Sequence, residues 1–364
     1  MDLSGQLIDG KYQLVRICGE GGMATVYKAV VRGAAGFQRP VAIKHIKPEY
    51  RAIKNYIDMF IEEARVGAEL AHPNIVQVHD FCSEGGSYYL VMEWVEGVDL
   101  GALIKFYRDN GQLVPWPLAV AIGIGTLRGL GAAHGRVTEN GQPAPVIHRD
   151  ISPHNVLVGI NGVVKLSDFG LAKARDRAAS MTAPGTVKGK LSYLAPEVTF
   201  GKPNSVQSDL FGVGSVLWET LTSERLFDGK TDIEIFKKIR LCKVPLLTEY
   251  REDLPASLIA VLDIALTADP AHRYASADEF AQALGQVMKQ AVGVNPASAL
   301  GAAVSAARSV DPTASMNQMP TQDNVVDDSL VTTAQHERPK RDSVDVEFST
   351  AEANVDPIEL TKKK

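Results

Sequence analysis

The chain has 364 residues, of which 45% are hydrophobic, which is enough for one two-lobed domain or two ordinary domains with a sizeable core. Its formal net charge is −5 at pH 7, and its Lys and Arg residues gather only in short clusters, so it lacks the basic field that nucleic-acid binding requires. No apolar run reaches the roughly 18 residues of a membrane-spanning helix, and the N-terminus has no signal-peptide pattern. We expect neither nucleic acid nor a membrane as a partner.

The three cysteines, Cys18, Cys82 and Cys242, lie far apart and form no C-x-x-C pair. This spacing does not suggest a disulfide framework, and it fits a reducing compartment. We therefore expect a cytoplasmic protein.

The first quarter of the chain is predicted to form a small sheet that holds one helix. Segments rich in β-branched and aromatic residues are the expected strands, and one segment with apolar residues at helical spacing is the expected helix. The strands are residues 12–18, 25–31, 41–46 and 88–94, and the helix is residues 57–70. From residue 100 to about 290 the pattern is mostly helical, in residues 118–133, 205–222, 231–240, 257–266 and 276–290.

Beyond residue 290 the composition shifts to small and polar residues with few large apolar ones. Such a segment cannot bury enough surface to fold alone, so we expect a disordered tail over residues 291–364, with a short Ala-rich helix allowed at residues 297–310. Because no further domain follows, an activating signal is expected through a partner, with partner binding by the tail itself as one route.

A glycine-rich segment lies between the first two expected strands. Such a hairpin can bring backbone N–H groups close to phosphate oxygens. Its residues are Gly19, Glu20, Gly21 and Gly22. Ala24 stands where a third glycine is usual, and for an isolated match of this kind an ordinary hairpin turn is an equal explanation.

Lys44 ends the segment Val-Ala-Ile-Lys on the third expected strand, at a fixed distance from the glycine-rich hairpin. An ammonium placed there can pair with phosphate oxygens. Glu63 on the following helix is positioned to reach back to Lys44. Glu62 is the competing candidate. We prefer Glu63 because its ten-residue interval to Pro73 is the one expected from the family that the chain resembles, which is named below.

Residues 148–155 read His-Arg-Asp-Ile-Ser-Pro-His-Asn. Asp150 suits a carboxylate that orients a hydroxyl proton of the substrate, and Asn155 offers an amide oxygen to a metal. Asp168, in Asp-Phe-Gly, follows a β-rich segment and adds a carboxylate. Mg²⁺ prefers a few oxygen ligands together with phosphate oxygens, so Asn155 and Asp168 are the expected metal ligands.

These motifs, followed in order by Ala195-Pro196-Glu197, Asp209 and Arg273, resemble those of eukaryotic-like (Hanks-type) serine/threonine protein kinases, and most closely the bacterial members. The resemblance covers about residues 11–290. It implies an α+β, bilobal protein kinase fold with a small β-rich N-lobe holding one main helix (residues 11–97) and a larger, mostly helical C-lobe (residues 98–290), followed by the disordered tail (residues 291–364).

The resemblance also implies the partners and the roles of the site residues. Protein substrates, ATP and Mg²⁺ are expected, with Asp150 orienting the acceptor hydroxyl and Lys44 paired with Glu63. The residues implied around the adenine are Val26 and Ala42 above it, Leu157 below it, and the backbone of Glu93 and Val95 at its edge, with Met92 gating the pocket behind. Asp209 is expected to support the catalytic loop, and Glu197 is expected to pair with Arg273.

In similar kinases the arginine before the catalytic aspartate, here Arg149, is neutralised by a phosphorylated activation loop. Thr182 and Thr186 lie nearest the implied position of that phosphate, and we expect autophosphorylation there. The alternative is that both are solvated loop residues.

Two residues depart from the family pattern. Ser152 stands where the family has a lysine, and Lys190 stands where it has a threonine that bonds the catalytic aspartate. One hypothesis is that the two types are exchanged, with Lys190 reaching the γ-phosphate and Ser152 taking the hydroxyl role. The equal alternative is that Lys190 faces solvent or an acidic substrate and the enzyme is slower.

Three functions compete at this point. A serine/threonine protein kinase is favoured, and tyrosine specificity is disfavoured because the arginine-bearing loop of tyrosine kinases is absent. An ATP-binding pseudokinase or scaffold is the alternative, opposed by the presence of Lys44, Asp150, Asn155 and Asp168. A small-molecule kinase is the third, opposed by the Ala-Pro-Glu segment and the long activation loop.

Overall fold

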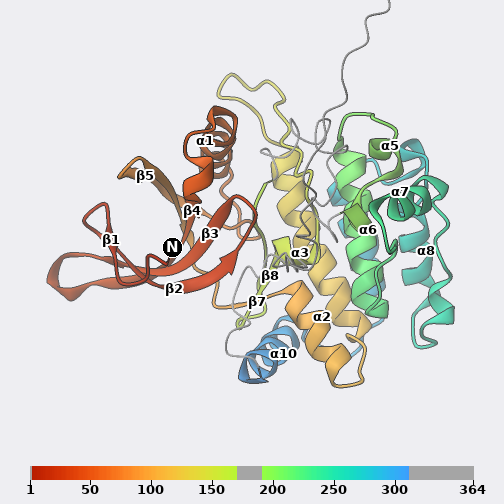
Figure 1. Ribbon diagram of the computed structural model, residues 1–364. Helices are drawn as coiled ribbons and strands as arrows, with labels where there is room; N and C mark the ends of the chain where they lie inside the picture. The colour runs from red at the N-terminus through yellow and green to blue at the C-terminus, as the bar shows by residue number, and fades with distance from the viewer. Residues whose placement is uncertain (1, 170–190, 311–364) are drawn as a thin grey trace, which may run out of the picture. The chain divides into compact units, whose positions relative to one another are not determined.

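The N-terminal part of the chain folds into a six-stranded antiparallel sheet in the order β1-β2-β3-β4-β6-β5. This is a computed structural model, and it describes residues 2–169 and 191–310 (Figure 1). The four predicted strands are present, and two short or polar ones join them. The bounds are β1 Leu7–Ile8, β2 Tyr12–Glu20, β3 Ala24–Arg32, β4 Gln38–Ile46, β5 Val78–Glu84 and β6 Ser87–Glu93.

Helix α1, Lys54–Glu69, is the one main helix of this lobe and packs on β5 (Figure 1). Its buried face includes Met59, Phe60 and Ala64, because apolar residues recur at helical spacing. The helix ends just before His72-Pro73, since proline disfavours helical backbone in the residue before it. Glu63 lies on the same buried face, where its carboxylate requires a partner.

The segment that links α1 to β5 is anchored to the helical lobe by backbone hydrogen bonds. Val76 N–H donates to the carbonyl of Leu166 over 2.9 Å, and Leu166 N–H donates to the carbonyl of Asn74 over 2.8 Å. The carbonyl of Asn74 also lies against Gly129, where a Cβ atom would come within 2.6 Å of it. The link between the lobes is therefore held by main-chain contacts.

A second, three-stranded sheet in the order β7-β8-β9 carries the segments on either side of the 148–155 loop. Gly97 in β7 is required by close packing, because a Cβ atom there would lie 2.0 Å from the carbonyl oxygen of Val158. The strands are β7 Gly97–Asp99, β8 Val156–Gly159 and β9 Val164–Leu166.

The rest of the described chain is helical, as predicted. Helix α3 runs through the middle of this lobe and contacts α6, α9 and β9 (Figure 1). The helices are α2 Leu100–Asp109, α3 Trp116–His134, α5 Pro196–Thr199, α6 Val206–Thr222, α7 Asp232–Leu241, α8 Ala256–Ala265 and α9 Ala277–Met288. The expectation of an α+β bilobal kinase fold is confirmed.

The expectation that no apolar stretch reaches membrane-spanning length is wrong for α3. This helix has 19 residues and a mean hydropathy of 1.2 over its best window, so it passes the length and composition test. Its apolar character has another cause, because 61% of that window is buried inside the protein. A central helix covered on most sides needs apolar residues all round, and the test is weak evidence for a membrane span.

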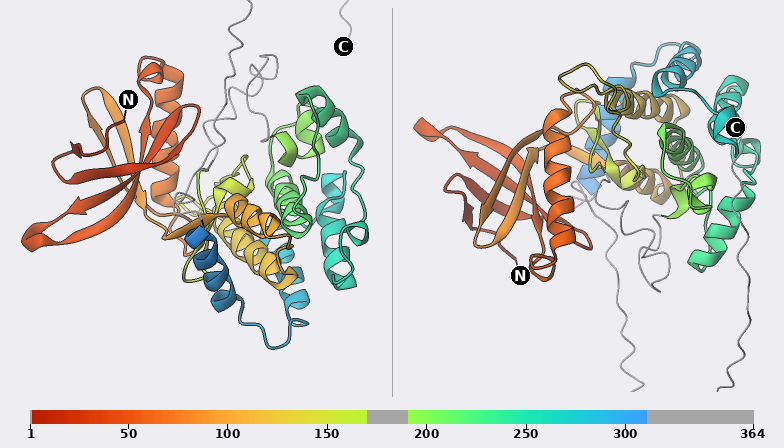
Figure 2. Two further views of the ribbon diagram at one scale, coloured as in Figure 1. Left: turned by 60° about the horizontal axis from the view of Figure 1, so that its bottom comes forward. Right: turned by 90° about the horizontal axis from the view of Figure 1, so that it is seen from above.

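The first part of the predicted tail contains a packed helix, whereas a disordered segment was expected. Residues Pro296–Val310 form helix α10, which packs on α2, α3, β7 and β8 (Figure 2). The prediction of disorder from residue 291 is therefore wrong for this stretch, although an Ala-rich helix at residues 297–310 was allowed. The reason is that Leu300 and Val304 find apolar surface on the C-lobe, which composition alone does not reveal. Residues 311–364 lie outside the described residues.

Candidate active site

The residue 148–155 loop is held from below by a single carboxylate, that of Asp209 near the start of α6. Its Oδ2 accepts the backbone N–H of His148 over 2.7 Å, and its Oδ1 accepts that of Arg149 over 2.9 Å. His134 Nε2 lies 2.9 Å from Oδ2. Asp209 is 2% exposed, so it supports the loop as expected and is not available to a substrate.

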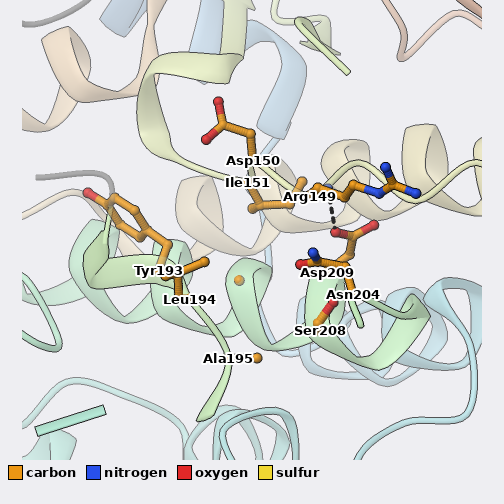
Figure 3. Close-up of a pocket in the computed structure, with 10 residues that line it drawn as sticks. Arg149, Asp150, Ile151, Tyr193, Leu194, Ala195, Asn204, Ser208 and Asp209 are labelled. Carbon is orange, nitrogen blue, oxygen red and sulfur yellow. Dashed lines mark hydrogen bonds between the residues drawn. The ribbon is translucent and has the colours of Figure 1, made fainter. Parts of the chain in front are cut away.

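Arg149 has φ +69°, a left-handed backbone conformation that L-residues seldom adopt. The two hydrogen bonds to Asp209 hold the loop in this conformation, which turns the chain so that Asp150 points the other way (Figure 3). Strained backbone of this kind clusters at active sites, where the surroundings hold a reactive side chain in place.

The Asp150 carboxylate is fixed by the far end of the same loop. Asn155 Nδ2 donates to Asp150 Oδ2 over 3.0 Å and to the Asp150 carbonyl over 2.7 Å. Both residues are buried, at 5% and 2% exposure. Because the amide nitrogen of Asn155 is bound to Asp150, its amide oxygen is the atom left to serve a metal.

Lys44 forms two ion pairs that join the lobes. Its Nζ lies 2.5 Å from Glu63 Oε1 and 2.7 Å from Asp168 Oδ1. The ion pair predicted between Lys44 and Glu63 is present, and the competing Glu62 pairs instead with Arg65 on the exposed side of α1, at 3.1 Å. Strand β4, helix α1 and the Asp-Phe-Gly segment thus meet at one ammonium.

The charge of Lys44 is stabilised by these partners. Burial alone lowers its pKa, but the carboxylates of Asp168 and Glu63 outweigh burial and raise the pKa above its ordinary value. Lys44 is 7% exposed. The ammonium therefore stays protonated and is positioned to pair with phosphate oxygens when a nucleotide enters.

Asp168 also has a left-handed backbone, with φ +55°. The neighbouring Phe169 packs on His148, with ring centroids 4.7 Å apart, and His148 Nε2 lies 3.0 Å from the carbonyl of Ser167. Burial lowers the pKa of His148, which favours its neutral form. The Asp-Phe-Gly segment is therefore packed directly against the catalytic loop.

The donor set suits a hard divalent cation. Ser167 N–H donates to the backbone carbonyl of Asn155 over 2.9 Å, so the two segments that carry Asn155 and Asp168 lie side by side. Mg²⁺ commonly takes only one or two protein ligands and completes its shell with water and phosphate oxygens. Among residues 2–169 and 191–310, no cluster of three His, Cys, Asp or Glu side chains is arranged to hold a metal by itself.

The glycine-rich segment forms the turn between β2 and β3. Gly19 pairs with Val26 and Glu20 with Thr25, and Gly21 N–H donates to the carbonyl of Ala24 over 2.8 Å. Gly22 is exposed at the tip of this hairpin. The hairpin is compatible with the phosphate role implied by the family and equally with a simple turn.

The residues implied around the adenine lie together in one apolar cluster. Val26 and Ala42 come from the N-lobe sheet, Leu157 comes from β8, and all three are at most 5% exposed. Met92, from β6, and Val95, from the segment that connects the lobes, also belong to the cluster. Two lobes thus contribute apolar side chains to a surface suited to a flat aromatic ligand.

A small pocket lies beneath the catalytic loop and not at this apolar cluster. Figure 3 shows its lining, with Asp150 at one end and Asp209 at the other. Tyr193 forms part of its wall and donates its hydroxyl to Glu219 Oε2 over 2.6 Å. Burial raises the pKa of Glu219. The sequence analysis did not single out Tyr193 or Glu219, because an isolated aromatic and an isolated helical carboxylate carry no motif.

One further expected interaction is present, and one expected hydrogen bond is not. Glu197 forms a buried, two-pronged ion pair with Arg273, with both N–O distances 2.8 Å, as expected. Ser152 is 1% exposed, and its Oγ has no hydrogen-bond partner among residues 2–169 and 191–310, so it does not bond to Asp150. The remaining predicted site residues, Lys190, Thr182 and Thr186, lie outside the described residues.

The comparisons with known proteins all point to one family. Residues 12–285 match the family model described as the protein kinase domain. The chain is 39% identical over 293 residues to a Myxococcus xanthus protein named tyrosine-protein kinase MasK, and 34% identical over 279 residues to the Bacillus subtilis serine/threonine-protein kinase PrkC. It is 36% identical over 289 residues to the Mycobacterium tuberculosis serine/threonine-protein kinase PknA.

These matches cover 80%, 76% and 78% of this chain, but only 45%, 40% and 62% of the respective relatives. The chain thus spans about half the length of the curated relatives it matches. Among solved structures, the PknI kinase domain of M. tuberculosis superposes with a TM-score of 0.58 at 26% identity, covering 79% of this chain and all of that one.

Proposed function

Because this chain belongs to the protein kinase family, we propose that it transfers the γ-phosphate of ATP to serine or threonine hydroxyls of protein substrates, with Mg²⁺ as the metal. The observation that carries the proposal is that four groups from both lobes, Lys44, Asp150, Asn155 and Asp168, are held in place by one another or by Glu63. Lys44, paired with Glu63, contacts Asp168, while Asn155 holds Asp150. The alternative of an ATP-binding pseudokinase or scaffold is opposed by the presence of all four groups in one ordered site.

Each residue has one part in the proposed reaction. Asp150 accepts the hydrogen bond of the acceptor hydroxyl and orients its oxygen toward the phosphorus. Lys44 holds phosphate oxygens of the nucleotide. Asn155 and Asp168 would hold the metal, which neutralises charge on the phosphates when bound. Because there is little covalent chemistry for the protein to perform, positioning and electrostatics supply most of the rate.

The acceptor is proposed to be serine or threonine. PrkC and PknA are named serine/threonine-protein kinases, whereas MasK is named a tyrosine-protein kinase. Phosphoamino-acid analysis of the labelled products therefore decides which hydroxyl accepts the phosphate. The protein is incubated with γ-labelled ATP, Mg²⁺ and a mixed protein substrate. We expect phosphoserine and phosphothreonine. Phosphotyrosine alone would contradict the proposed acceptor while leaving the phosphotransfer itself intact.

We also propose that Lys190 supplies the positive charge that Ser152 lacks. The motive is the exchange of residue types at the two positions, since Ser152 stands where the family has a lysine. The buried hydroxyl of Ser152 has no hydrogen-bond partner within the described part of the chain. Losing one electrostatic stabiliser of the transition state costs on the order of a hundredfold in rate. Lys190→Ala is expected to show this loss, and Lys190→Ala with Ser152→Lys is expected to recover part of it. Unchanged turnover in Lys190→Ala would refute the exchange.

Regulation is proposed to act through autophosphorylation at Thr182 and Thr186. A phosphate there carries about two negative charges and would pair with Arg149. Phosphopeptide mapping of the active protein tests this proposal, with the Thr182→Ala and Thr186→Ala variants as controls. Both threonines unmodified in active protein would count against it.

Partner binding through residues 291–364 remains a prediction, for which a pull-down with that segment is the direct measurement.

The proposed setting is the cytoplasm. Cys18, Cys82 and Cys242 are all free thiols in the structure, and burial raises the pKa of Cys82 and of Cys242 to about 11. Thiols of this kind persist in a reducing compartment, where ATP is also present.

A further inference from the structure

Helix α10 lies beyond residue 285, where the match to the protein kinase family model ends, yet it packs like a core helix. Leu300, Val304 and Ala307 form its buried face and are 1%, 0% and 4% exposed. The helix contacts β7 and β8, beside which it lies in Figure 1, and also α2 and α3. It therefore belongs to the folded kinase lobe and not to a solvated tail.

The contact between α10 and the C-lobe is a close backbone approach. A Cβ atom on Gly301 would lie 2.4 Å from the carbonyl oxygen of Ile160. On the opposite side, a Cβ atom on Gly162 would lie 2.0 Å from the carbonyl oxygen of Ala297, and Gly162 also has φ +74°. Glycine on both sides is what allows the helix to dock at this depth.

The C-terminal end of α10 reaches the segment that connects the two lobes. Arg308 forms an ion pair with Glu96 in that connector. Glu96 also accepts the indole N–H of Trp94 over 2.6 Å and lies 3.8 Å from the ammonium of Lys28, on β3 of the N-lobe sheet. Lys28 in turn lies over the Trp94 ring, 4.6 Å from its centroid. We call this group of four side chains the connector cluster.

The connector cluster is joined to the elements that carry the apolar site implied for adenine. Lys28 follows Val26 by two residues on β3, so both side chains project from the same face of the sheet. Trp94 and Glu96 flank Val95 in the connector. Leu157, below the site, lies on β8, against which α10 packs. Through Glu96, helix α10 is therefore linked both to β3 above the site and to β8 below it.

We propose that α10 is a brace for the nucleotide site and that Arg308 is a positioning residue for ATP binding. Arg308 touches no substrate atom and acts through Glu96, which holds the connector against β3. The inference rests on the proposed ATP site. It predicts that loosening α10 weakens adenine binding while the catalytic loop, held separately by Asp209, keeps its chemistry.

The test measures the Kd of the full-length chain for adenylyl imidodiphosphate with Mg²⁺, which reports binding without any transfer. In Arg308→Ala we expect a Kd higher by roughly two- to fivefold, since a half-exposed ion pair contributes up to about a factor of five. Arg308→Lys retains the charge and is expected to restore most of the affinity. Adenosine alone is expected to lose the same factor, because the brace acts on the adenine end of the site.

A second variant acts on the docking itself. The side chain added in Gly301→Val meets the Ile160 carbonyl, so α10 must lift, and we expect a Kd increase at least as large as in Arg308→Ala. Faster hydrogen exchange at residues 296–310 would confirm that the helix has detached. Turnover at saturating ATP is expected to be unchanged in both variants, because a loss of uniform binding raises KM and leaves kcat alone.

Lys105→Ala serves as the matched control, because it removes an exposed ion pair on α2, with Asp109 at 2.5 Å, away from the connector. Its Kd is expected to equal that of the unsubstituted chain. Unchanged affinity in both Arg308→Ala and Gly301→Val overturns the brace, as does an equal loss in Lys105→Ala. If the unsubstituted chain binds no analogue, the proposed ATP site is wrong and the brace falls with it.

Discussion

At the scale of single residues, the site is defined by side chains whose charges are matched in pairs or triplets. Lys44 has two carboxylates, Asp209 has two backbone N–H groups and a histidine, and Glu197 has Arg273. Buried charges persist only when paired and hydrogen-bonded, because desolvation is otherwise too costly. The buried hydroxyl of Ser152, by contrast, has no hydrogen-bond partner among the residues that the structure describes.

Replacing Asp209 tests how the catalytic loop is held. Asp209→Ala leaves the N–H groups of His148 and Arg149 without acceptors, and each unpaired buried group costs about 1–3 kcal/mol. We expect a lower free energy of unfolding in urea and a large loss of phosphotransfer. Asp209→Asn keeps one acceptor oxygen, so its stability and its phosphotransfer rate should lie between those of the unsubstituted chain and those of Asp209→Ala. Asp228→Ala, an exposed aspartate of the same lobe, is the control, and equal stabilities of the two alanine variants would contradict this role.

His45 gives the protein a specific sensitivity to acid. Burial and the nearby Arg51 lower the pKa of His45 to about 4, and Arg51 Nη2 lies 3.1 Å from His45 Nε2. Arginine can only donate, so Nε2 must be unprotonated. Between pH 6.5, the ordinary pKa, and pH 4, the unfolded chain binds the extra proton, so this contribution to stability is present above pH 6.5 and is lost as the pH falls toward 4.

The expected size of this effect is about 3 kcal/mol at full titration. Urea unfolding at pH 7.5 and pH 4.5 measures it, with His45→Gln as the comparison, because glutamine can accept from Arg51 but does not titrate. We expect the unsubstituted chain to lose more stability between the two pH values than His45→Gln does. Parallel losses would show that His45 has no part in the acid response.

At the scale of elements, the lobes are connected by contacts that bring the backbones close together. Gly129 on α3 meets the carbonyl of Asn74, and Gly97 on β7 meets the carbonyl of Val158. The first contact holds the segment between α1 and β5 against the C-lobe, and this segment in turn positions α1 and its Glu63. Glycine at these positions is a requirement of packing and not of turn geometry, because neither has a positive φ.

A pair of glycine substitutions separates packing from helix propensity. In Gly129→Ala the new Cβ would lie 2.6 Å from a backbone oxygen that cannot move freely, so we expect a destabilisation of about 1–3 kcal/mol. Gly285 on α9 has no atom within 4 Å of such a Cβ, and Gly285→Ala is expected to stabilise by about 0.5–1 kcal/mol. Urea midpoints measure both. Two changes of the same sign would contradict the packing argument.

The elements with a clear hydrophobic pattern could be predicted from the sequence. The elements that are stabilised mainly by packing against a neighbouring element could not. Strands β2, β3, β4 and β6 and the long helices carry clear periodicity. Strand β5 is polar and part-exposed, and α10 is a small-residue helix that folds only because the C-lobe offers it a surface. The ion pair of Lys44 with Glu63 could be predicted because both residues lie in motifs. The contacts of Tyr193 with Glu219 and of Arg308 with Glu96 join residues distant in sequence, which no local pattern identifies.

At the scale of the whole molecule, both lobes contribute to one reaction site. The N-lobe brings Lys44 and Glu63, the C-lobe brings Asp150, Asn155 and Asp168, and the ion pair between Lys44 and Asp168 joins the two lobes. Residues 12–285 match the protein kinase family, and the docked helix α10 extends the folded unit to residue 310. The lobes are thus arranged for nucleotide to enter next to a catalytic loop that is already formed.

The most direct test of phosphotransfer compares the unsubstituted chain with Asp150→Asn. Transfer of label from γ-labelled ATP to a protein substrate and the Kd for adenylyl imidodiphosphate are measured on both. The substitution keeps the size of the side chain and removes the carboxylate that orients the hydroxyl, so we expect the transfer rate to fall by about 10²- to 10⁴-fold with nucleotide affinity retained. Label that persists undiminished in Asp150→Asn, or is absent from both proteins, would contradict the account.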